Sequence, residues 1–161
     1  MITVSGGIMA KVAVLHPPRQ LVLFRVGETH YGLDIEAVGE ILPVLPVTAL
    51  PGAPAGVLGI ADVRERVVPV FDLHWKFGVP TPGSNPEARL ILVRAGEGPV
   101  ALLVGAVEEV VTVSREDFQS VATPGSVSGL GYLNGIVRRG DRLVLWIDHA
   151  RLVPERMLPA A

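Results

Sequence analysis

Short runs of mixed apolar and polar residues recur along the chain, separated by glycine-containing turns. Residues 21–26 read LVLFRV, a Gly-Glu turn follows, and residues 31–35 read YGLDI. Residues 90–95 and 99–104 repeat this arrangement as LILVRA and PVALLV around a second glycine turn. Runs of this length on either side of a short turn are typical of β-hairpins. The pattern therefore predicts a protein built mainly from short strands.

The chain also contains an internal repeat. Residues 21–42 and 90–111 match at nine of 22 positions without a gap, at an offset of 69 residues. Residues 59–74 (GIADVRERVVPVFDLH) and 135–150 (GIVRRGDRLVLWIDHA) match at an offset of 76. The difference between the offsets indicates an insertion within residues 114–132, where Ser, Thr and Gly are frequent and a loop is expected.

The repeat divides the chain into two halves, about residues 20–80 and 88–153, joined by the polar linker PTPGSNPE. About five short strands in each half are too few for a stable open sheet and favour a small closed barrel. We therefore predict a mainly β fold with two small five-stranded β-barrel subdomains, a pseudo-twofold relation and short helical turns. Residues 1–19 are expected to form a flexible leader and residues 156–161 a tail.

Three polar residues stand where short helices are expected to begin. Asp72 and Asp148 each follow the last strand of a half and precede a helix-compatible run. Their carboxylates are expected to accept hydrogen bonds from the first helical turn. Ser114 precedes Arg-Glu-Asp, which is typical of a capped helix start with an acidic first turn.

Composition limits the classes of partner. Fourteen basic and sixteen acidic residues give a net charge of -2, so nucleic acid is not an expected partner. The absence of cysteine excludes disulfides and thiolate metal sites and fits a reducing cytoplasm. Residues 41–61 carry no charge, but four prolines interrupt them, so direct membrane insertion is not expected.

The sequence predicts no catalytic, cofactor-binding or metal site. The four histidines lack the paired spacing of metal ligands, and Ser126 and Ser128 lack the surroundings of an activated nucleophile. We therefore expect that the protein is not an enzyme. A hydrolase or metal enzyme that uses His74 or His149 is the alternative from this class of functions.

The polar residues of greatest interest lie in one predicted hairpin and one predicted strand. Arg64, Glu65 and Arg66 interrupt an otherwise apolar hairpin. Arginine at a hairpin tip can form forked hydrogen bonds to a partner's carboxylate, although a solvated turn explains the same residues without a partner. Glu40 stands between apolar residues in a strand, and Gly140 replaces the tip arginine in the second half.

Several motifs occur in a fixed order along about residues 20–155. They are AVGEI (37–41), VTALP (47–51), GIADVR (59–64), VVPVFDL (67–73), KFG (76–78), VEEVV (107–111), GYLNGI (131–136) and DRLVLWID (141–148). In this order and spacing they resemble the CheW family of bacterial chemotaxis coupling proteins. The resemblance implies the two-barrel fold predicted above.

The resemblance also implies a function. Members of this family act as non-enzymatic adaptors between methyl-accepting chemotaxis receptors and the histidine kinase CheA. The expected partners are the regulatory domain of a CheA-type kinase and the cytoplasmic tip of the receptors, with no cofactor. The expected location is cytoplasmic, in receptor arrays at the inner face of the membrane. A divergent adaptor of a pilus-motility or Frz-type pathway, or a self-associating structural module, are alternatives.

Residue by residue, the resemblance implies a partner-binding surface. Arg64 matches the family arginine implicated in receptor coupling, and Glu40 matches a glutamate with apolar neighbours. Asp62 and Glu65 depart from the family asparagine and glycine, so acids flank the coupling arginine. The predicted partner-binding residues are Val38, Glu40, Ile41, Gly59, Asp62, Arg64 and Arg66.

Overall fold

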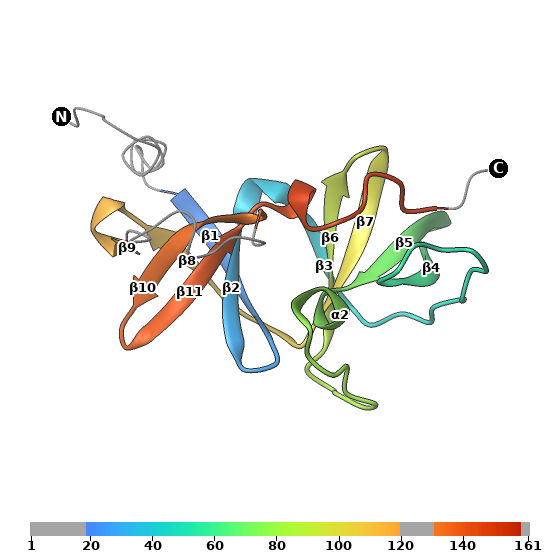
Figure 1. Ribbon diagram of the computed structural model, residues 1–161, viewed down its shortest axis with the longest axis horizontal. Helices are drawn as coiled ribbons and strands as arrows, with labels where there is room; N and C mark the ends of the chain where they lie inside the picture. Colours follow the sequence, from blue (N-terminus) through green and yellow to red (C-terminus); the bar gives the residue numbers. More distant parts are fainter. Residues whose placement is uncertain (1–18, 120–130, 159–161) are drawn as a thin grey trace.

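The computed structural model describes residues 19–119 and 131–158 (Figure 1). Strands dominate this part of the chain, and the helices are single turns. The strands are β1 (Arg19–Val26), β2 (Thr29–Asp34), β3 (Val38–Pro43), β4 (Val57–Val63), β5 (Arg66–Asp72), β6 (Arg89–Ala95), β7 (Gly98–Val104), β8 (Ala106–Val113), β9 (Phe118–Gln119), β10 (Leu133–Arg139) and β11 (Arg142–Ile147). The helical turns are η1 (Ile35–Ala37), α2 (Leu73–Phe77), η2 (Arg115–Asp117) and η4 (His149–Arg151).

The strands form two sheets, which lie side by side along the long axis of the molecule (Figure 1). Sheet A has the order β8-β1-β2-β11-β10-β9, and sheet B has the order β3-β6-β7-β5-β4. The predicted fold class, mainly β with two small related units and short helical turns, is confirmed.

The sheets do not follow the two halves of the sequence. Sheet B contains β3 to β7, whereas sheet A combines the first two strands of the chain with the last four. The expectation that residues 20–80 and 88–153 each form their own barrel is therefore corrected. Each half contributes its first hairpin to the sheet that contains the last hairpin of the other half, through the parallel pairs β2–β11 and β5–β7.

The exchange preserves the symmetry of the repeat. Replacing each strand of one half by its equivalent in the other converts the order β3-β6-β7-β5-β4 into β8-β1-β2-β11-β10. The registers agree as well, because Val70 lies opposite Ala101 in sheet B and the equivalent Trp146 lies opposite Gly32 in sheet A. Strand β9 is the one addition to sheet A in the described part of the chain.

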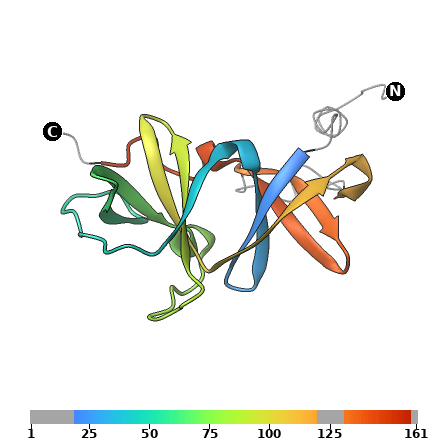
Figure 2. The same ribbon diagram turned by 180° about the vertical axis from the view of Figure 1, so that it is seen from behind.

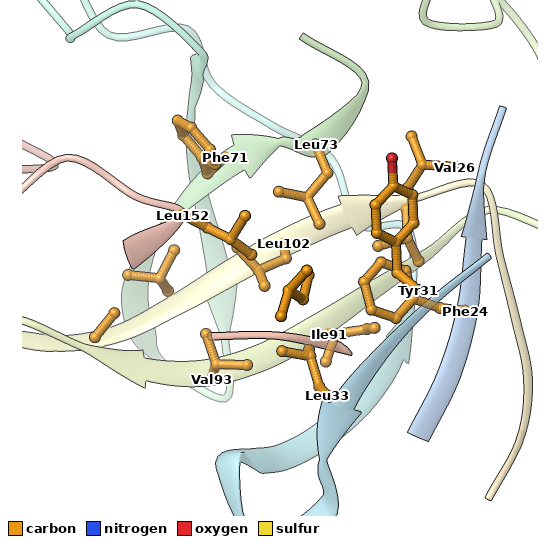
Figure 3. Packing of buried hydrophobic residues seen from close by; sticks show 14 of the residues in the cluster. Phe24, Val26, Tyr31, Leu33, Phe71, Leu73, Ile91, Val93, Leu102 and Leu152 are labelled. Carbon is orange, nitrogen blue, oxygen red and sulfur yellow. The ribbon is translucent and has the colours of Figure 1, made fainter. Parts of the chain in front are cut away.

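The largest apolar cluster lies between the two sheets (Figure 3). Phe24 and Leu33 enter it from sheet A, and Phe71, Ile91 and Leu102 enter it from sheet B. All five are buried, and burial of such a side chain contributes about 1.5 to 3 kcal/mol. Because this shared core joins the sheets, their relative position is set by packing and not by the linker alone.

An aromatic series crosses the same junction. Phe77 from α2 stacks on Tyr31 from β2, with ring centroids 4.2 Å apart, and Tyr31 also stacks on Phe24 at 5.6 Å. On its other side Phe77 meets Tyr132 at 5.6 Å. Burial, followed by the neighbouring Tyr132, raises the pKa of Tyr31 to about 12. The short helix of sheet B thus interdigitates with residues of sheet A.

The predicted caps are confirmed. Asp72 Oδ1 accepts from the backbone N–H of His74 at 2.9 Å, and Asp148 Oδ1 accepts from that of Ala150 at 3.0 Å. At η2, the backbone N–H of Ser114 donates to Asp117 Oδ2 at 2.8 Å. The aspartates therefore end each terminal strand and begin the next turn.

Some predictions fall outside the described residues. These include residues 120–130 of the insertion with Ser126 and Ser128, the leader before Arg19, and the last three residues of the tail. None of the helices in the described part of the chain has the length and apolar character needed to cross a bilayer.

Candidate functional site

The hairpin between β4 and β5 turns through two residues in the left-handed region. Arg64 has a φ of 50° and Glu65 a φ of 68°. Two-residue hairpin loops favour this geometry, because it matches the twist of the strands, but they usually use asparagine and glycine. Asp62 supports the turn, since its Oδ1 accepts from the backbone N–H of Glu65 at 2.8 Å. The turn therefore places Arg64 at the tip of the hairpin at some conformational cost.

Arg64 and Glu40 form a two-pronged ion pair. Nη1 and Nη2 of Arg64 donate to Oε1 and Oε2 of Glu40. The arginine side chain is 70% exposed and the glutamate side chain 27%. Hydrogen bonds from Arg64 hold the pKa of Glu40 below its usual range, and the carboxylate raises the pKa of Arg64. The two residues that the sequence singled out separately thus constitute one site.

The ion pair joins the two edges of sheet B. Glu40 lies on β3, one edge strand, whereas Arg64 follows β4, the opposite edge strand. A second link connects the segment after β3 to β4, because the backbones of Thr48 and Ile60 exchange hydrogen bonds of 2.8 and 2.9 Å. Sheet B must therefore curl to bring its edges together, and the site lies across the seam.

Sheet A has a related arrangement at the equivalent position. Glu109, the counterpart of Glu40, lies 3.6 Å from Arg142 Nη2, and Glu108 lies 3.5 Å from Nη1. His30 Nδ1 also lies 2.8 Å from Glu108 Oε1. Here the arginine comes from the first residue of β11, because Gly140 occupies the position equivalent to Arg64. An acid–arginine pair thus occurs near the equivalent hairpin in both halves.

The other predicted site residues occupy different environments. Ile41 is 40% exposed next to Glu40, whereas Val38 packs against the shared core. Gly59 is buried with a φ of 150°, and a Cβ there would lie 2.0 Å from the carbonyl oxygen of Thr48. Arg66 is exposed and has no ion-pair partner within residues 19–119 and 131–158. The structure thus brings Glu40 together with the turn residues, whereas Ile41, the next residue of the strand, points to the opposite face, and Gly59 lies against the backbone of the seam.

His74 and His149 each contact a neighbouring oxygen atom in the fold. His74 is buried, and its Nδ1 lies 2.8 Å from Asp72 Oδ1, while Thr81 donates to Asp72 Oδ2 at 2.5 Å. His149 Nε2 lies 2.9 Å from the carbonyl oxygen of Arg94. Among the described residues, no three His, Cys, Asp or Glu side chains are grouped so that they could hold a metal ion. His74 is therefore part of the cap between β5 and the linker.

Sequence reasoning missed two exposed apolar side chains of the described structure. Val67 is 62% exposed and Trp75 51%, although both belong to apolar runs. Strand alternation gives no signal for Val67, because Arg66 and Val67 are both exposed and the five residues that follow in β5 are all buried. The position of Trp75 depends on how α2 packs, and the sequence pattern does not contain that information.

The fold and the site together describe a two-sheet scaffold whose distinctive polar groups are surface ion pairs on the seams. The CheW-like domain family matches residues 20–157, and the chain belongs to this CheW family of chemotaxis scaffold and adaptor proteins. The chemotaxis protein CheW of Treponema pallidum is 33% identical over 145 residues, covering 86% of this chain and 84% of that protein.

A solved structure is also similar. The crystal structure of the scaffolding protein TtCheW from Thermoanaerobacter tengcongensis has a TM-score of 0.76 and 27% identity, and the match covers 88% of this chain and 97% of that one. Weaker similarities extend to PilI of Pseudomonas aeruginosa, at 25% identity over 79% of this chain and 71% of that protein. FrzA of Myxococcus xanthus is 36% identical over 40% of each chain.

Proposed function

We propose that this protein is a non-enzymatic adaptor that couples methyl-accepting chemotaxis receptors to a CheA-type histidine kinase. The observation that carries the proposal is the family match over residues 20–157, in a chain whose candidate site is an exposed ion pair. The adaptor would act in the cytoplasm, in receptor arrays at the inner face of the membrane. Its partners would be the kinase regulatory domain and the cytoplasmic tip of the receptor.

The geometry supports a role for the seam of sheet B in partner binding. Glu40 holds the Arg64 guanidinium in one orientation, so that a partner meets a preorganised charged pair and loses less side-chain entropy on binding. Arg66 adds a second exposed cation, which has no ion-pair partner in the described part of the chain, and Ile41 would offer an exposed apolar contact on the opposite face of β3. Val38, Gly59 and Asp62 would act indirectly, by keeping the strand, the close backbone approach and the turn in place.

Replacement of Arg64 by glutamate tests this proposal. The variant places two acids against each other across the seam, so we expect receptor-dependent control of kinase autophosphorylation to be lost. Because the pair is exposed, its loss should cost no more than about 1 kcal/mol. In a chain of this size that lowers the midpoint of thermal unfolding by roughly 2 to 4 °C. The measurement is phosphate incorporation by the kinase with receptor vesicles, with and without receptor ligand.

Arg94→Glu is the matched control, because Arg94 is another exposed strand arginine whose side chain has no partner within the described ranges. It should leave coupling unchanged. If the Arg64→Glu variant keeps full receptor-dependent control of the kinase, or if both variants lose it equally, Arg64 is not a specific coupling residue. Failure of the parent protein to bind the kinase regulatory domain would remove the adaptor function itself.

A second candidate pathway is favoured by the similarity to PilI and FrzA. In that case the same fold would serve a pilus-motility or Frz-type system. Purification of the tagged protein from its native cell, with identification of the kinase that accompanies it, distinguishes the pathways. A chemotaxis kinase supports the first candidate, and a kinase encoded with pilus or Frz components supports the second.

A further inference from the structure

After its last helical turn, each half of the chain crosses from one sheet to the other. Val79, which follows α2, meets the β1–β2 turn of sheet A, where a Cβ on Gly27 would lie 3.5 Å from its side chain. Glu155, which follows η4, meets the β6–β7 turn of sheet B, where a Cβ on Gly96 would lie 3.3 Å from its carbonyl oxygen. The repeat offset of 76 residues relates Val79 to Glu155, so the two crossings are equivalent.

The second crossing consists of residues 153–158, which we call the strap. It leaves η4 and runs across sheet B toward the far end of that sheet (Figures 1 and 2). The strap contains no strand or helix, and it makes no hydrogen bond or ion pair to any described residue. Its polar side chains and Leu158 are exposed, and Val153 is partly buried. Met157, at 7% exposure, is the one fully inserted side chain of the strap.

The two crossings are anchored by different chemistry at equivalent positions. In the linker, the Thr81 hydroxyl donates to the buried carboxylate of Asp72 at 2.5 Å. The offset of 76 residues places Met157 at the same position of the strap, where its thioether belongs to the core shared by the two sheets. A hydroxyl–carboxylate bond is insensitive to mild oxidants, whereas a thioether is oxidised readily. The chain has three methionines and no cysteine, so thioethers are its only oxidisable sulfur groups.

We propose that Met157 is an oxidation site whose state decides whether the strap stays attached to sheet B. Hydrogen peroxide transfers one oxygen atom to Sδ of Met157. The O–O bond breaks, an S=O bond forms, the sulfur loses two electrons and the peroxide is reduced to water. Apart from Tyr31, the buried members of the shared core carry no side-chain hydrogen-bond donor for the new oxygen. The sulfoxide is therefore expelled from the core, and the strap is released with it.

The architecture of the strap gives the oxidant access to the sulfur. A segment without backbone hydrogen bonds opens locally much more often than the whole domain unfolds. Release uncovers apolar surface at the junction of the sheets, because Met157 packs in the cluster that joins them. Thiol-dependent methionine sulfoxide reductases restore the thioether, so the release is reversible.

Limited digestion with trypsin after peroxide treatment of the full chain tests the proposal. Mass spectrometry measures the sulfoxide at Met157, and the rate of cleavage after Arg156 measures the detached fraction, since a protease cuts the open form. We expect oxidation to accelerate this cleavage about tenfold or more. Cleavage after Arg94, which lies on β6, should not change. Treatment with methionine sulfoxide reductases for both sulfoxide epimers should restore the original rate.

Variants of two neighbouring residues separate release from oxidation. Met157→Leu keeps an apolar side chain of similar size without a sulfur, so it should resist cleavage before and after peroxide. Combining it with Leu158→Met moves the thioether to the adjacent exposed position, where it should be oxidised without release. Met157→Gln should be cleaved quickly without peroxide, whereas the matched Leu158→Gln should behave like the parent.

Several results would overturn the proposal. Sulfoxide at Met157 with an unchanged rate of cleavage after Arg156 would show that the thioether does not hold the strap. Intact Met157 in a solution where free methionine is oxidised would show that it is not an oxidation site. Equal acceleration after Arg94 would indicate unfolding of the whole protein, and peroxide-induced release in Met157→Leu would place the cause elsewhere.

Discussion

Arg64 and Glu65 occupy backbone positions that glycine and asparagine adopt at little cost. A side chain with a Cβ loses about 1 to 2 kcal/mol in the left-handed region. The chain accepts this cost at two successive residues, and Asp62 compensates part of it through the hydrogen bond to the Glu65 backbone. At Arg64 the conformation has a clear consequence, since it brings the guanidinium to Glu40. Glu65 has no ion-pair partner among the described residues that would justify its own cost.

Glu65→Gly is therefore expected to stabilise the protein. Glycine removes the left-handed strain at φ 68° but increases the entropy of the unfolded chain, so the net gain should be about 0.5 to 1 kcal/mol. The backbone N–H that donates to Asp62 is retained. Chemical denaturation measures the change, and Glu36→Gly, an exposed glutamate with no positive φ, provides a control that should lose stability. A less stable Glu65→Gly variant would show that the turn is not strained.

The sequence indicated which individual residues belong to the candidate site, but it did not indicate which of them contact each other. Arg64 and Glu40 were each recognisable as polar residues in apolar segments, but their pairing depends on the two edges of sheet B approaching each other. The alternation of apolar and polar residues does not show that these two edge strands approach each other. Gly59 was assigned to partner binding, and the structure adds a local constraint, the contact with the Thr48 carbonyl, that no residue with a Cβ could satisfy.

At the element scale, the edge strands β3 and β4 are protected by linking them to each other. An unpaired edge exposes backbone groups that can bind another strand. The Thr48–Ile60 hydrogen bonds and the Glu40–Arg64 ion pair connect the two edges at separate points. In sheet A, Glu109 of the edge strand β8 lies 3.6 Å from Arg142 at the start of β11, so an acid and an arginine connect two strands there as well, although β11 is not an edge strand.

The contribution of Glu40 to this seam should depend on pH in a defined direction. Its pKa is lower in the folded protein than in the unfolded chain, so its charged form stabilises the fold above the unfolded-state pKa of about 4.3. That stabilisation is lost as the pH falls through the lowered folded-state value. The parent should therefore be more stable than Glu40→Gln at pH 7, and the difference should shrink in acid.

Urea denaturation of both proteins at several pH values provides the measurement. Glu36→Gln, an exposed glutamate without an ion pair in the described ranges, should show no comparable pH-dependent difference. If the gap between the parent and Glu40→Gln is the same at pH 3 and pH 7, the ion pair does not contribute through its charge.

The number and type of elements could be predicted, but their partners could not. Both hairpins of each half and the capping aspartates follow from alternation, turns and the repeat. The pairing of β2 with β11 and of β5 with β7 is parallel and crosses from one half to the other. Local patterns are the same whether a hairpin pairs within its own half or with the other half, so the exchange became visible only in the strand order.

At the scale of the whole molecule, the exchange and the shared core make the two sheets interdependent. Each sheet contains strands from both halves of the chain, so neither half can complete its sheet alone. The aromatic series adds a second connection. Phe77 and Tyr132 are far from Phe24 and Tyr31 in sequence, so composition and spacing gave no indication of it. For an adaptor with partners on different surfaces, this rigidity would keep the distance between those surfaces constant.

Phe77 is the residue through which this interdependence can be measured. It belongs to the helix that follows sheet B, yet it stacks on Tyr31 of sheet A and contacts Tyr132. Phe77→Ala should cost about 2 to 3 kcal/mol, below the value for a fully buried phenylalanine because Phe77 is only partly buried. It should also lower the pKa of Tyr31 from about 12, because loss of the stacked ring admits water to the phenol.

Spectrophotometric titration in a Tyr132→Phe background isolates this effect, because the chain has two tyrosines and Tyr31 is then the sole one. Trp75→Ala is the matched control on the same helix; its exposed ring contacts Phe71 of sheet B, so it should leave the titration of Tyr31 unchanged. A stability loss in Phe77→Ala without a change in the Tyr31 titration would mean that the ring supports its own helix. A stability loss together with a lower pKa of Tyr31 would mean that α2 connects the two sheets. Tyr31 belongs to sheet A, whereas Phe77 belongs to the helix that follows sheet B.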